Sequence, residues 1–369
     1  MRVLHVVATN GRRGAETFAA DLIRSLNHTG VTQHVAVLRR SKEAPLSFEA
    51  PATFLDSDGR SVPGLHLSRT AIRELRQLAE AWKPDVLQVH GGEPLKHAVV
   101  ARRNGTPLVY RRIGSAPSRI TRGPSRLAHG HLMRQATRVV AVAEALSRET
   151  IETFRVPPER VLTIPNAVDA ERLQRDRPPR DVRAMLDISS DAGVLISVGA
   201  LTWEKDPDAH VEVSNLVREQ LPGVVHLFVG DGPLRPELER AIHERGLDGR
   251  VRLLGARDDV PELLSGADVI LLASRVEGLP GCLIEAGLVR RPAVAFALAG
   301  VPEIVEDGRT GFLAPPGDVQ ALARAASRLL ADPDMRASMG EAAEERCRSR
   351  FDIRVVAPRY LDLYAELAG

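Results

Sequence analysis

The sequence predicts an α/β protein made of two doubly wound parallel sheets. Short apolar runs alternate with amphipathic segments along the chain, which is the rhythm of parallel strands joined by crossover helices. That rhythm pauses in a polar stretch with a Pro pair at residues 171–180 and restarts at Val194. A chain of 369 residues is long enough for two hydrophobic cores. We therefore expect two sheets separated by a linker.

The strands and helices of the first half follow from this alternation. Helices are expected at Glu16–Leu26, Ile72–Ala81 and Leu95–Arg103, and strands at Val3–Ala8, Val35–Leu38, Val86–His90 and Leu108–Tyr110. The second half repeats the pattern with strands at Val194–Val198, Val225–Val229, Val251–Leu254, Val269–Leu272, Ala293–Phe296 and Gly311–Ala314. These elements predict an N-terminal domain at 1–170, a linker at 171–185 and a C-terminal domain at 186–350. Residues 351–369 are expected to end the chain as a helix.

The composition excludes several classes of protein. Only two cysteines, Cys282 and Cys347, argue against a disulfide framework and fit a reducing compartment. The apolar run after Met1 is too short for a secretory signal, and no run approaches the length of a bilayer span. We expect a soluble, cytoplasmic protein with no nucleic-acid partner.

Charge is distributed unevenly between the halves. Residues 1–169 carry 25 Lys and Arg against 15 Asp and Glu, while residues 170–369 carry 25 against 33. No acid occurs between Glu93 and Glu144, a stretch that holds ten basic residues. This segment either attracts an anionic ligand or a membrane surface, or is an ordinary Arg-rich surface, and the sequence leaves both open.

The most informative stretch is Glu277–Ala286, which reads Glu-Gly-Leu-Pro-Gly-Cys-Leu-Ile-Glu-Ala. An offset of eight residues turns through about 80° beyond two full circles of a helix, so the two glutamates lie on different elements. We expect Glu277 in the loop after the strand at 268–273, and Glu285 in the following helix. Free backbone N–H groups at that helix start would cradle a diphosphate, while the carboxylates accept hydrogen bonds from sugar hydroxyls.

This stretch resembles the E-x7-E signature of family 4 glycosyltransferases, retaining enzymes of the GT-B fold, in which two Rossmann-like domains face each other across a cleft. The resemblance implies a nucleoside diphosphate sugar as donor and no further cofactor. It places Glu277 by the reacting centre and Glu285 on the donor ribose. The backbone of Gly278, Leu279, Pro280, Gly281 and Cys282 would hold the diphosphate, and the last helix would cross back to the first domain.

A second match follows the strand that ends at Val198. Residues 199–206, Gly-Ala-Leu-Thr-Trp-Glu-Lys-Asp, are similar to the family's Gly-Arg-Leu-x-x-x-Lys-Gly loop. Lys205 falls on the Lys and would stabilise the departing diphosphate. The family's Arg is replaced by Ala200, so another cation, such as Arg275 or an N-domain arginine, would have to substitute.

Two further segments point to the nucleotide. Gly230, in Gly-Asp-Gly-Pro, resembles the family's turn near the nucleotide, but the same residues also make a generic strand-to-helix turn. Arg257 follows the strand whose backbone the family uses against the donor base, which makes Arg257 a candidate for the nucleotide pocket.

In the first half, Gly14-Ala15-Glu16 is similar to the family's Gly-Gly-Ala-Glu loop, where glycine lets the backbone approach the donor. Gly11 and Gly14 do not form a dinucleotide-binding Gly-x-Gly-x-x-Gly, which disfavours an oxidoreductase. The family's His after the strand at 108–110 is absent, with Ile113 near its place.

Three basic side chains are candidates for an acceptor site. Arg111 and Arg112 are suited to an anionic acceptor or to the diphosphate. His90, before a Gly pair, would face the same ligand or simply be a satisfied histidine beside a turn. The acceptor would then be a small molecule or a lipid-linked one, with peripheral membrane contact through the basic half.

No metal site is expected. The three Asp-x-Asp strings, Asp56–Asp58, Asp206–Asp208 and Asp332–Asp334, lie in turn-like sequence, and spaced Cys/His clusters are lacking.

These observations favour a retaining glycosyltransferase that moves a hexose-type sugar to an acceptor held by the N-terminal domain. A nucleotide-sugar 2-epimerase and a catalytically silent, donor-binding partner protein remain as alternatives. Acceptor-dependent diphosphate release separates the three.

Overall fold

The computed structural model describes residues 1–41, 45–55, 61–62, 67–102, 105–116, 120–175 and 181–369. Within them the chain divides into an N-terminal unit, Met1–Ala167 with Ile353–Gly369, and a C-terminal unit, Val168–Asp352. Each unit is built around one parallel sheet. The predicted fold class, two doubly wound α/β domains, is confirmed. No helix of the described residues has the length and apolar character needed to cross a bilayer.

The N-terminal unit holds a seven-stranded parallel sheet in the order β3-β2-β1-β6-β7-β8-β9. Its strands are β1 (Arg2–Thr9), β2 (Thr32–Arg39), β3 (Ala52–Phe54), β6 (Val86–His90), β7 (Leu108–Arg112), β8 (Arg138–Ala141) and β9 (Val161–Thr163), beside a hairpin of β4 (Ser61–Val62) and β5 (Leu67–Ser68). Its helices are α1 (Gly14–Leu26), α2 (Arg69–Trp82), α3 (Gly92–Ala101), α4 (Gly123–Met133), α5 (Glu144–Glu152), the 3-10 turn η1 (Pro158–Arg160) and α15 (Ile353–Ala368).

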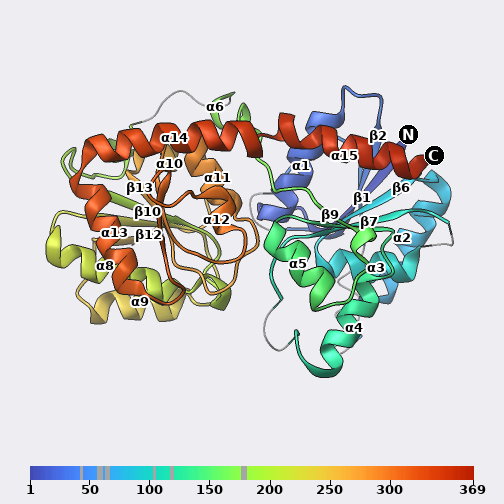
Figure 1. Cartoon of the computed structure of the whole chain (residues 1–369), viewed down its shortest axis with the longest axis horizontal. Coiled ribbons are helices and arrows are strands. Elements are labelled where there is room, and N and C mark those ends of the chain that lie inside the picture. The colour runs from blue at the N-terminus through green and yellow to red at the C-terminus, as the bar shows by residue number, and fades with distance from the viewer. Residues whose placement is uncertain (42–44, 56–60, 63–66, 103–104, 117–119, 176–180) are drawn as a thin grey trace. The chain divides into compact units, whose positions relative to one another are not determined.

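The two faces of this sheet are covered by different helices, because successive strand residues point to opposite sides. One face packs on α2, α3 and α4 through a core that includes Leu75 and Leu95. The other packs on α1 and α15, which lie side by side (Figure 1) and contribute Phe18, Tyr360 and Tyr364. The Tyr364 hydroxyl donates to Gln88 Oε1 in the central strand β6, at 2.9 Å. The last helix therefore belongs to the core of the N-terminal unit.

The C-terminal unit holds a six-stranded parallel sheet in the order β12-β11-β10-β13-β14-β15. Its strands are β10 (Val194–Val198), β11 (Val225–Val229), β12 (Val251–Leu253), β13 (Val269–Leu272), β14 (Ala293–Phe296) and β15 (Gly311–Ala314). Its helices are α6 (Arg172–Arg175), α7 (Val182–Met185), the 3-10 turn η2 (Trp203–Lys205), α8 (Pro207–Gln220), α9 (Arg235–Glu244), α10 (Val260–Gly266), α11 (Gly281–Leu288), α12 (Val301–Ile304), α13 (Val319–Ala331) and α14 (Pro333–Phe351).

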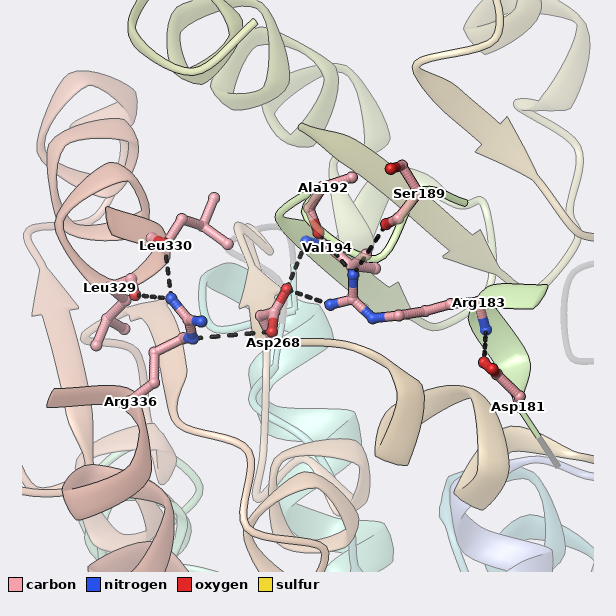
Figure 2. Close-up of polar contacts among 9 residues, drawn as sticks. All are labelled: Asp181, Arg183, Ser189, Ala192, Val194, Asp268, Leu329, Leu330 and Arg336. Atoms are coloured by element: carbon pink, nitrogen blue, oxygen red, sulfur yellow. Dashed lines mark hydrogen bonds and ion pairs between the residues drawn. The ribbon is translucent and has the colours of Figure 1, made fainter. Parts of the chain in front are cut away.

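Asp268, just before β13, anchors the amino end of this sheet (Figure 2). Its Oδ2 accepts hydrogen bonds from Val194 N at 2.7 Å and Arg183 Nη2 at 2.8 Å. Arg336 Nε lies 3.8 Å from the other oxygen, and its Nη1 donates to the carbonyls of Leu329 and Leu330 at the end of α13. One carboxylate thus ties β10, α7 and α14 together at the edge opposite the strand ends that carry the candidate site.

Candidate functional site

Two neighbouring strands of the C-terminal sheet bring the predicted catalytic side chains together. β10 and β13 are paired in parallel, with Leu195 opposite Val269, so the loops that leave their carboxyl ends meet. Lys205 stands in η2 after β10, and Glu277 in the loop after β13. The Lys205 Nζ donates to Glu277 Oε1 at 2.6 Å. The sequence-predicted pair is therefore a direct ion pair.

The pair is largely withdrawn from water. The side chain of Glu277 is 6% exposed and that of Lys205 28%. Desolvation lowers the pKa of Lys205, but the Glu277 carboxylate, with Cys282 and Glu204, more than offsets it and leaves the pKa raised. Lys205 is thus a fixed cation, held ready beside an acidic group.

The backbone joins the same two loops. The N–H groups of Arg275 and Val276 donate to the Glu204 carbonyl, at 2.9 and 3.2 Å. The Arg275 guanidinium is bidentate on Asp206, at 2.5 and 3.0 Å. Arg275, named as a substitute for the cation missing at Ala200, is therefore already engaged by a carboxylate within this loop.

The turn from residue 277 to 280 leads into α11, as the sequence predicts. Gly278, Leu279 and Pro280 are buried, and the Gly278 carbonyl accepts from Gly300 N at 2.8 Å. Pro280 is the N-cap, and no side chain in the described part of the chain caps α11. The first N–H groups of this helix, at Gly281 and Cys282, consequently lie at a positive helix end without an acidic cap.

Cys282 adjoins the ion pair at this helix start. Burial raises the pKa of its thiol to about 12, Lys205 lowers it in part, and Glu277 and Glu285 raise it further. A thiol with this pKa stays protonated at neutral pH and is a poor nucleophile. Cys282 thus lies beside the ion pair as an uncharged thiol.

Glu285, the second carboxylate of the signature, lies inside α11 and is paired. Arg172 Nη2 lies 3.3 Å from Glu285 Oε1, and both side chains are largely buried. Arg172 comes from α6, whose start is capped by Asp169 Oδ1 on the N–H groups of Glu171 and Arg172. Sequence reasoning missed Arg172, because it falls in the stretch taken as a linker and carries no motif.

Gly230 shapes the Lys205 loop through its backbone. Its φ of 141° is a left-handed value, and a Cβ there would lie 2.0 Å from the Gly199 carbonyl oxygen. Two hydrogen bonds hold the same contact, from Gly199 N to Val229 O and from Leu201 N to Asp231 O. The Gly-Asp-Gly-Pro turn thus supports the loop that presents Lys205.

Arg257 is bidentate on Asp259, with Nε at 2.7 Å and Nη2 at 2.5 Å from the two carboxylate oxygens. The hydrogen bonds to Asp259 raise the pKa of Arg257, so the guanidinium stays charged. Its expected part in a nucleotide pocket stays a prediction.

The candidate acceptor residues Arg111 and Arg112 are buried inside the N-terminal unit, 1% and 2% exposed. Arg111 lies 3.6 Å over the Phe18 ring and donates to Asn166 Oδ1 at 2.6 Å. Arg112 donates to Leu146 O and Thr150 Oγ1 and pairs with Glu149. Both guanidinium groups bind residues of the N-terminal unit, and neither side chain is exposed. Their predicted binding of an acceptor stays a prediction.

His90 is also buried, at the end of a hydrogen-bonded chain. The amide nitrogen of Gln33 donates to Ile23 O, so its oxygen accepts from His5 Nε2 at 3.1 Å. His5 Nδ1 must then accept from His90 Nε2, at 3.2 Å. Burial, His5 and Arg111 lower the pKa of His90 well below its usual value. His90 is a neutral core residue in this unit.

Gly14 and Glu16 begin α1 beside the carboxyl end of β1. A Cβ at Gly14 would meet nothing within 4 Å, so packing alone does not require glycine there. Burial raises the pKa of Glu16 to about 7. Backbone hydrogen bonds at Glu16 and Thr9 and the charges of Arg13 and Arg111 lower this pKa in part. Glu16 therefore titrates near neutrality.

The two Asp-x-Asp strings that the structure describes lie at the starts of α8 and α14 and not in turns, and their carboxylates form ion pairs and one helix cap. Asp206 pairs with Arg275, Asp208 with Arg245, and Asp332 accepts from Met335 N at the start of α14. Asp56 and Asp58 lie outside the described residues. Among the residues described, no group of His, Cys, Asp and Glu is arranged to hold a metal ion.

Two family models match the chain. One, described as Glycosyltransferase Family 4, matches residues 12–172, and the other, described as Glycosyl transferases group 1, matches residues 180–346. The second match contains Lys205, Glu277 and Glu285.

Curated relatives match over most of the chain. It is 30% identical over 346 residues to the 2-deoxystreptamine N-acetyl-D-glucosaminyltransferase of Streptomyces fradiae, covering 87% of this chain and 80% of that protein. It is 26% identical over 353 residues to the lipopolysaccharide core biosynthesis glycosyltransferase LpsE of Rhizobium meliloti, covering 95% and 96%.

Among solved structures, Alr3699/HepE of Anabaena in complex with UDP and glucose aligns with a TM-score of 0.82 and 23% identity. The alignment covers 99% of this chain and 100% of that one. It supports the GT-B arrangement of the fold.

Proposed function

Because this chain belongs to the group 1 glycosyltransferases, we propose that it transfers a hexose-type sugar from a nucleoside diphosphate donor to an acceptor hydroxyl with retention of configuration. One observation carries the proposal: the Lys205–Glu277 pair, 2.6 Å between charged atoms, stands beside the uncapped start of α11. A helix start with free N–H groups binds a diphosphate, and a fixed lysine stabilises its charge as it leaves.

The donor would be bound mainly by the C-terminal unit, with the loop at Gly14 of the N-terminal unit approaching it. The N–H groups of Gly281 and Cys282 take the diphosphate, Lys205 its leaving oxygen, and Glu285 the ribose hydroxyls. Glu277 accepts a hydrogen bond from the sugar. The UDP complex of the similar Anabaena fold suggests UDP as the first nucleotide to test.

The transfer breaks the bond between the anomeric carbon and the leaving phosphate oxygen. The acceptor oxygen attacks the same face of the sugar, and its proton passes to the departing diphosphate. The only carboxylate assigned next to the sugar, Glu277, is tied to Lys205 and is used for positioning. Lys205 supplies the charge that metal-dependent transferases take from a divalent ion, so we propose a metal-independent reaction.

The acceptor is proposed to be anionic and bound by the basic N-terminal unit. Of the basic residues between Glu93 and Glu144, Arg122 is exposed and Arg126 half-buried, whereas Arg111 and Arg112 are buried. The names of the two relatives above differ in this respect, since one is named for 2-deoxystreptamine and the other for lipopolysaccharide core biosynthesis. Either a soluble acid or a lipid-linked phosphate at a membrane surface fits this charge. Two free cysteines suit a reducing compartment such as the cytoplasm.

To test this proposal, the purified protein is incubated with nucleoside diphosphate sugars in the presence of EDTA. Release of the nucleoside diphosphate is measured with and without acceptors from a cell extract. Acceptor-dependent release, with an unchanged anomeric configuration by NMR, is expected. Acceptor-free turnover to a new sugar would indicate an epimerase instead, and donor binding without turnover a silent protein.

A further inference from the structure

His210 connects the two loops that carry Lys205 and Glu277. It stands in the first turn of α8, which begins directly after the Lys205 loop, and is 4% exposed. One ring nitrogen, Nδ1, lies 3.0 Å from the carbonyl of Asp206, the residue after Lys205. The other, Nε2, lies 3.0 Å from the N–H of Ala273, the residue after β13 and four before Glu277.

These partners fix the tautomer of the ring. A backbone carbonyl only accepts, so Nδ1 carries the proton; a backbone N–H only donates, so Nε2 carries the lone pair. Neutral His210 satisfies both partners at once. The imidazolium would present an N–H to the N–H of Ala273 and lose that bond.

The surroundings of the ring keep it neutral. Desolvation lowers the pKa of His210, while Asp206 and Glu277 raise it and Lys205 lowers it. His226 of β11 is a further titratable group beside it, and burial and His210 lower the pKa of His226. Phe228 packs edge-on against the ring at 5.8 Å between centroids.

The ring and the lysine also share a cavity. Lys205 and His210 line a common cavity of about 20 Å³, together with Phe228 and Leu272. Movement of the ring would therefore reach Lys205 through the Asp206 backbone and through this cavity, and would reach Glu277 through Ala273.

We propose that His210 is a positioning residue, which holds Lys205 and Glu277 in register for the donor by clamping Asp206 to Ala273. The proposal rests on the proposed function for the role of the Lys205–Glu277 pair. The clamp itself is a property of the free protein and can be measured without turnover.

The two halves of the clamp can be removed separately. In His210→Gln the side-chain oxygen can accept from Ala273 N, at the place of Nε2. In His210→Asn the amide nitrogen can donate to Asp206 O, at the place of Nδ1. His210→Leu loses both bonds while filling the space. Asp268→Asn is the matched control, because it weakens the same strand, β13, at its opposite end.

The first measurement is the rate at which acetic anhydride labels Lys205, followed by peptide mass spectrometry. His210→Leu is expected to raise this rate several-fold, His210→Gln less, and Asp268→Asn not at all. An unchanged rate in His210→Leu would overturn the proposal. Faster labelling in a protein whose wild type transfers no sugar would leave the clamp standing and sink the proposed function alone.

The second measurement is kcat against pH with the donor saturating. A displacement of a catalytic group by about 1 Å costs on the order of 100-fold, so His210→Leu is expected to lose about 10-fold to 100-fold in kcat, with rescue in His210→Gln. Wild type is expected to lose activity at acidic pH as His210 protonates, and His210→Gln to lack that acidic limb. Equal kcat in all three variants and wild type would contradict the proposal.

Discussion

Lys205 Nζ lies 2.6 Å from Glu277 Oε1, so the proposed catalytic cation and carboxylate neutralise each other before any donor binds. A donor diphosphate must therefore compete with Glu277 for the lysine. The competition favours ligands that also hydrogen-bond Glu277, as a sugar does, over bare phosphate.

A double-mutant cycle tests this pair. Lys205→Met leaves Glu277 buried without its partner and is expected to cost about 3 kcal/mol of unfolding free energy, the lower end of the range of about 3–5 kcal/mol for buried pairs, because Lys205 is partly exposed. Lys205→Met with Glu277→Gln should regain that stability. Both variants should lose on the order of 100-fold or more in kcat. Recovery of activity along with stability in the double variant would refute a catalytic role.

Glu285→Gln should weaken donor binding more than turnover. The substitution removes the charge facing Arg172 and replaces a charged hydrogen-bond acceptor by a neutral one, so the Kd for UDP should rise about 10-fold. Calorimetric titration with UDP measures it, and Arg172→Lys serves as the control that retains the charge. A larger loss in kcat than in affinity would place Glu285 at the reacting centre instead.

Gly230→Ala should disturb the Lys205 loop. The new Cβ would stand 2.0 Å from Gly199 O on a residue with φ of 141°, which is expected to cost at least about 2 kcal/mol and most of the activity. Gly14→Ala is the matched control, since its Cβ meets nothing within 4 Å. Thermal unfolding of Gly230→Ala and Gly14→Ala measures the difference. Equal melting temperatures would show that the Lys205 loop shifts to accept the new Cβ without loss of stability.

Glu16→Gln should flatten the pH dependence of stability. The folded-state pKa of Glu16 is about 7, above its unfolded value of 4.5, so the native state binds the extra proton between these values. The protonated Glu16 side chain therefore stabilises the folded state at low pH. This stabilisation, up to about 3 kcal/mol of unfolding free energy, is lost as the pH rises towards and through 7.

Urea unfolding of wild type and Glu16→Gln at pH 5 and pH 8 measures the effect. The unfolding free energy of Glu16→Gln should exceed that of wild type at pH 8 and equal it at pH 5. A parallel loss in both proteins would assign the pH dependence to other groups.

Asp268→Asn should lower stability without touching chemistry. It weakens the charged hydrogen bonds to Val194 and Arg183 and the attraction of Arg336, with an expected cost of about 1–3 kcal/mol. Because Asp268 lies at the amino end of β13, kcat at 25 °C should match wild type. A fall in kcat with unchanged urea midpoint would show that the two ends of the strand are coupled.

The fold could be predicted from local patterns in the sequence, and the two residues at the centre of the candidate site from the resemblance of their motifs to those of family 4 glycosyltransferases. Buried parallel strands are continuous apolar runs, and Glu277 and Lys205 stand at fixed offsets after two of them. Adjacent parallel strands then bring these residues together without further information.

The rest depended on partners far away in sequence. The acceptor-binding role of Arg111 and Arg112 stays a prediction, but their packing could not be foreseen, since both residues end β7 inside the unit beside Phe18, Asn166 and Glu149. Nothing in residues 111–112 signals those partners. His210 and Arg172 were missed for the same reason, since each is defined by a contact to Ala273 or Glu285 across the fold.

The return of α15 to the N-terminal unit makes the C-terminal unit one uninterrupted insertion, residues 168–352, within a discontinuous N-terminal unit. On the ribosome the inserted unit has its complete sequence first, while the earlier-synthesised half waits with the apolar surface that Tyr360 and Tyr364 will cover still open. The C-terminal unit can therefore complete its fold before the N-terminal unit, and a protein cut after residue 352 is expected to keep the C-terminal unit intact while the N-terminal unit, without α15, exposes apolar surface.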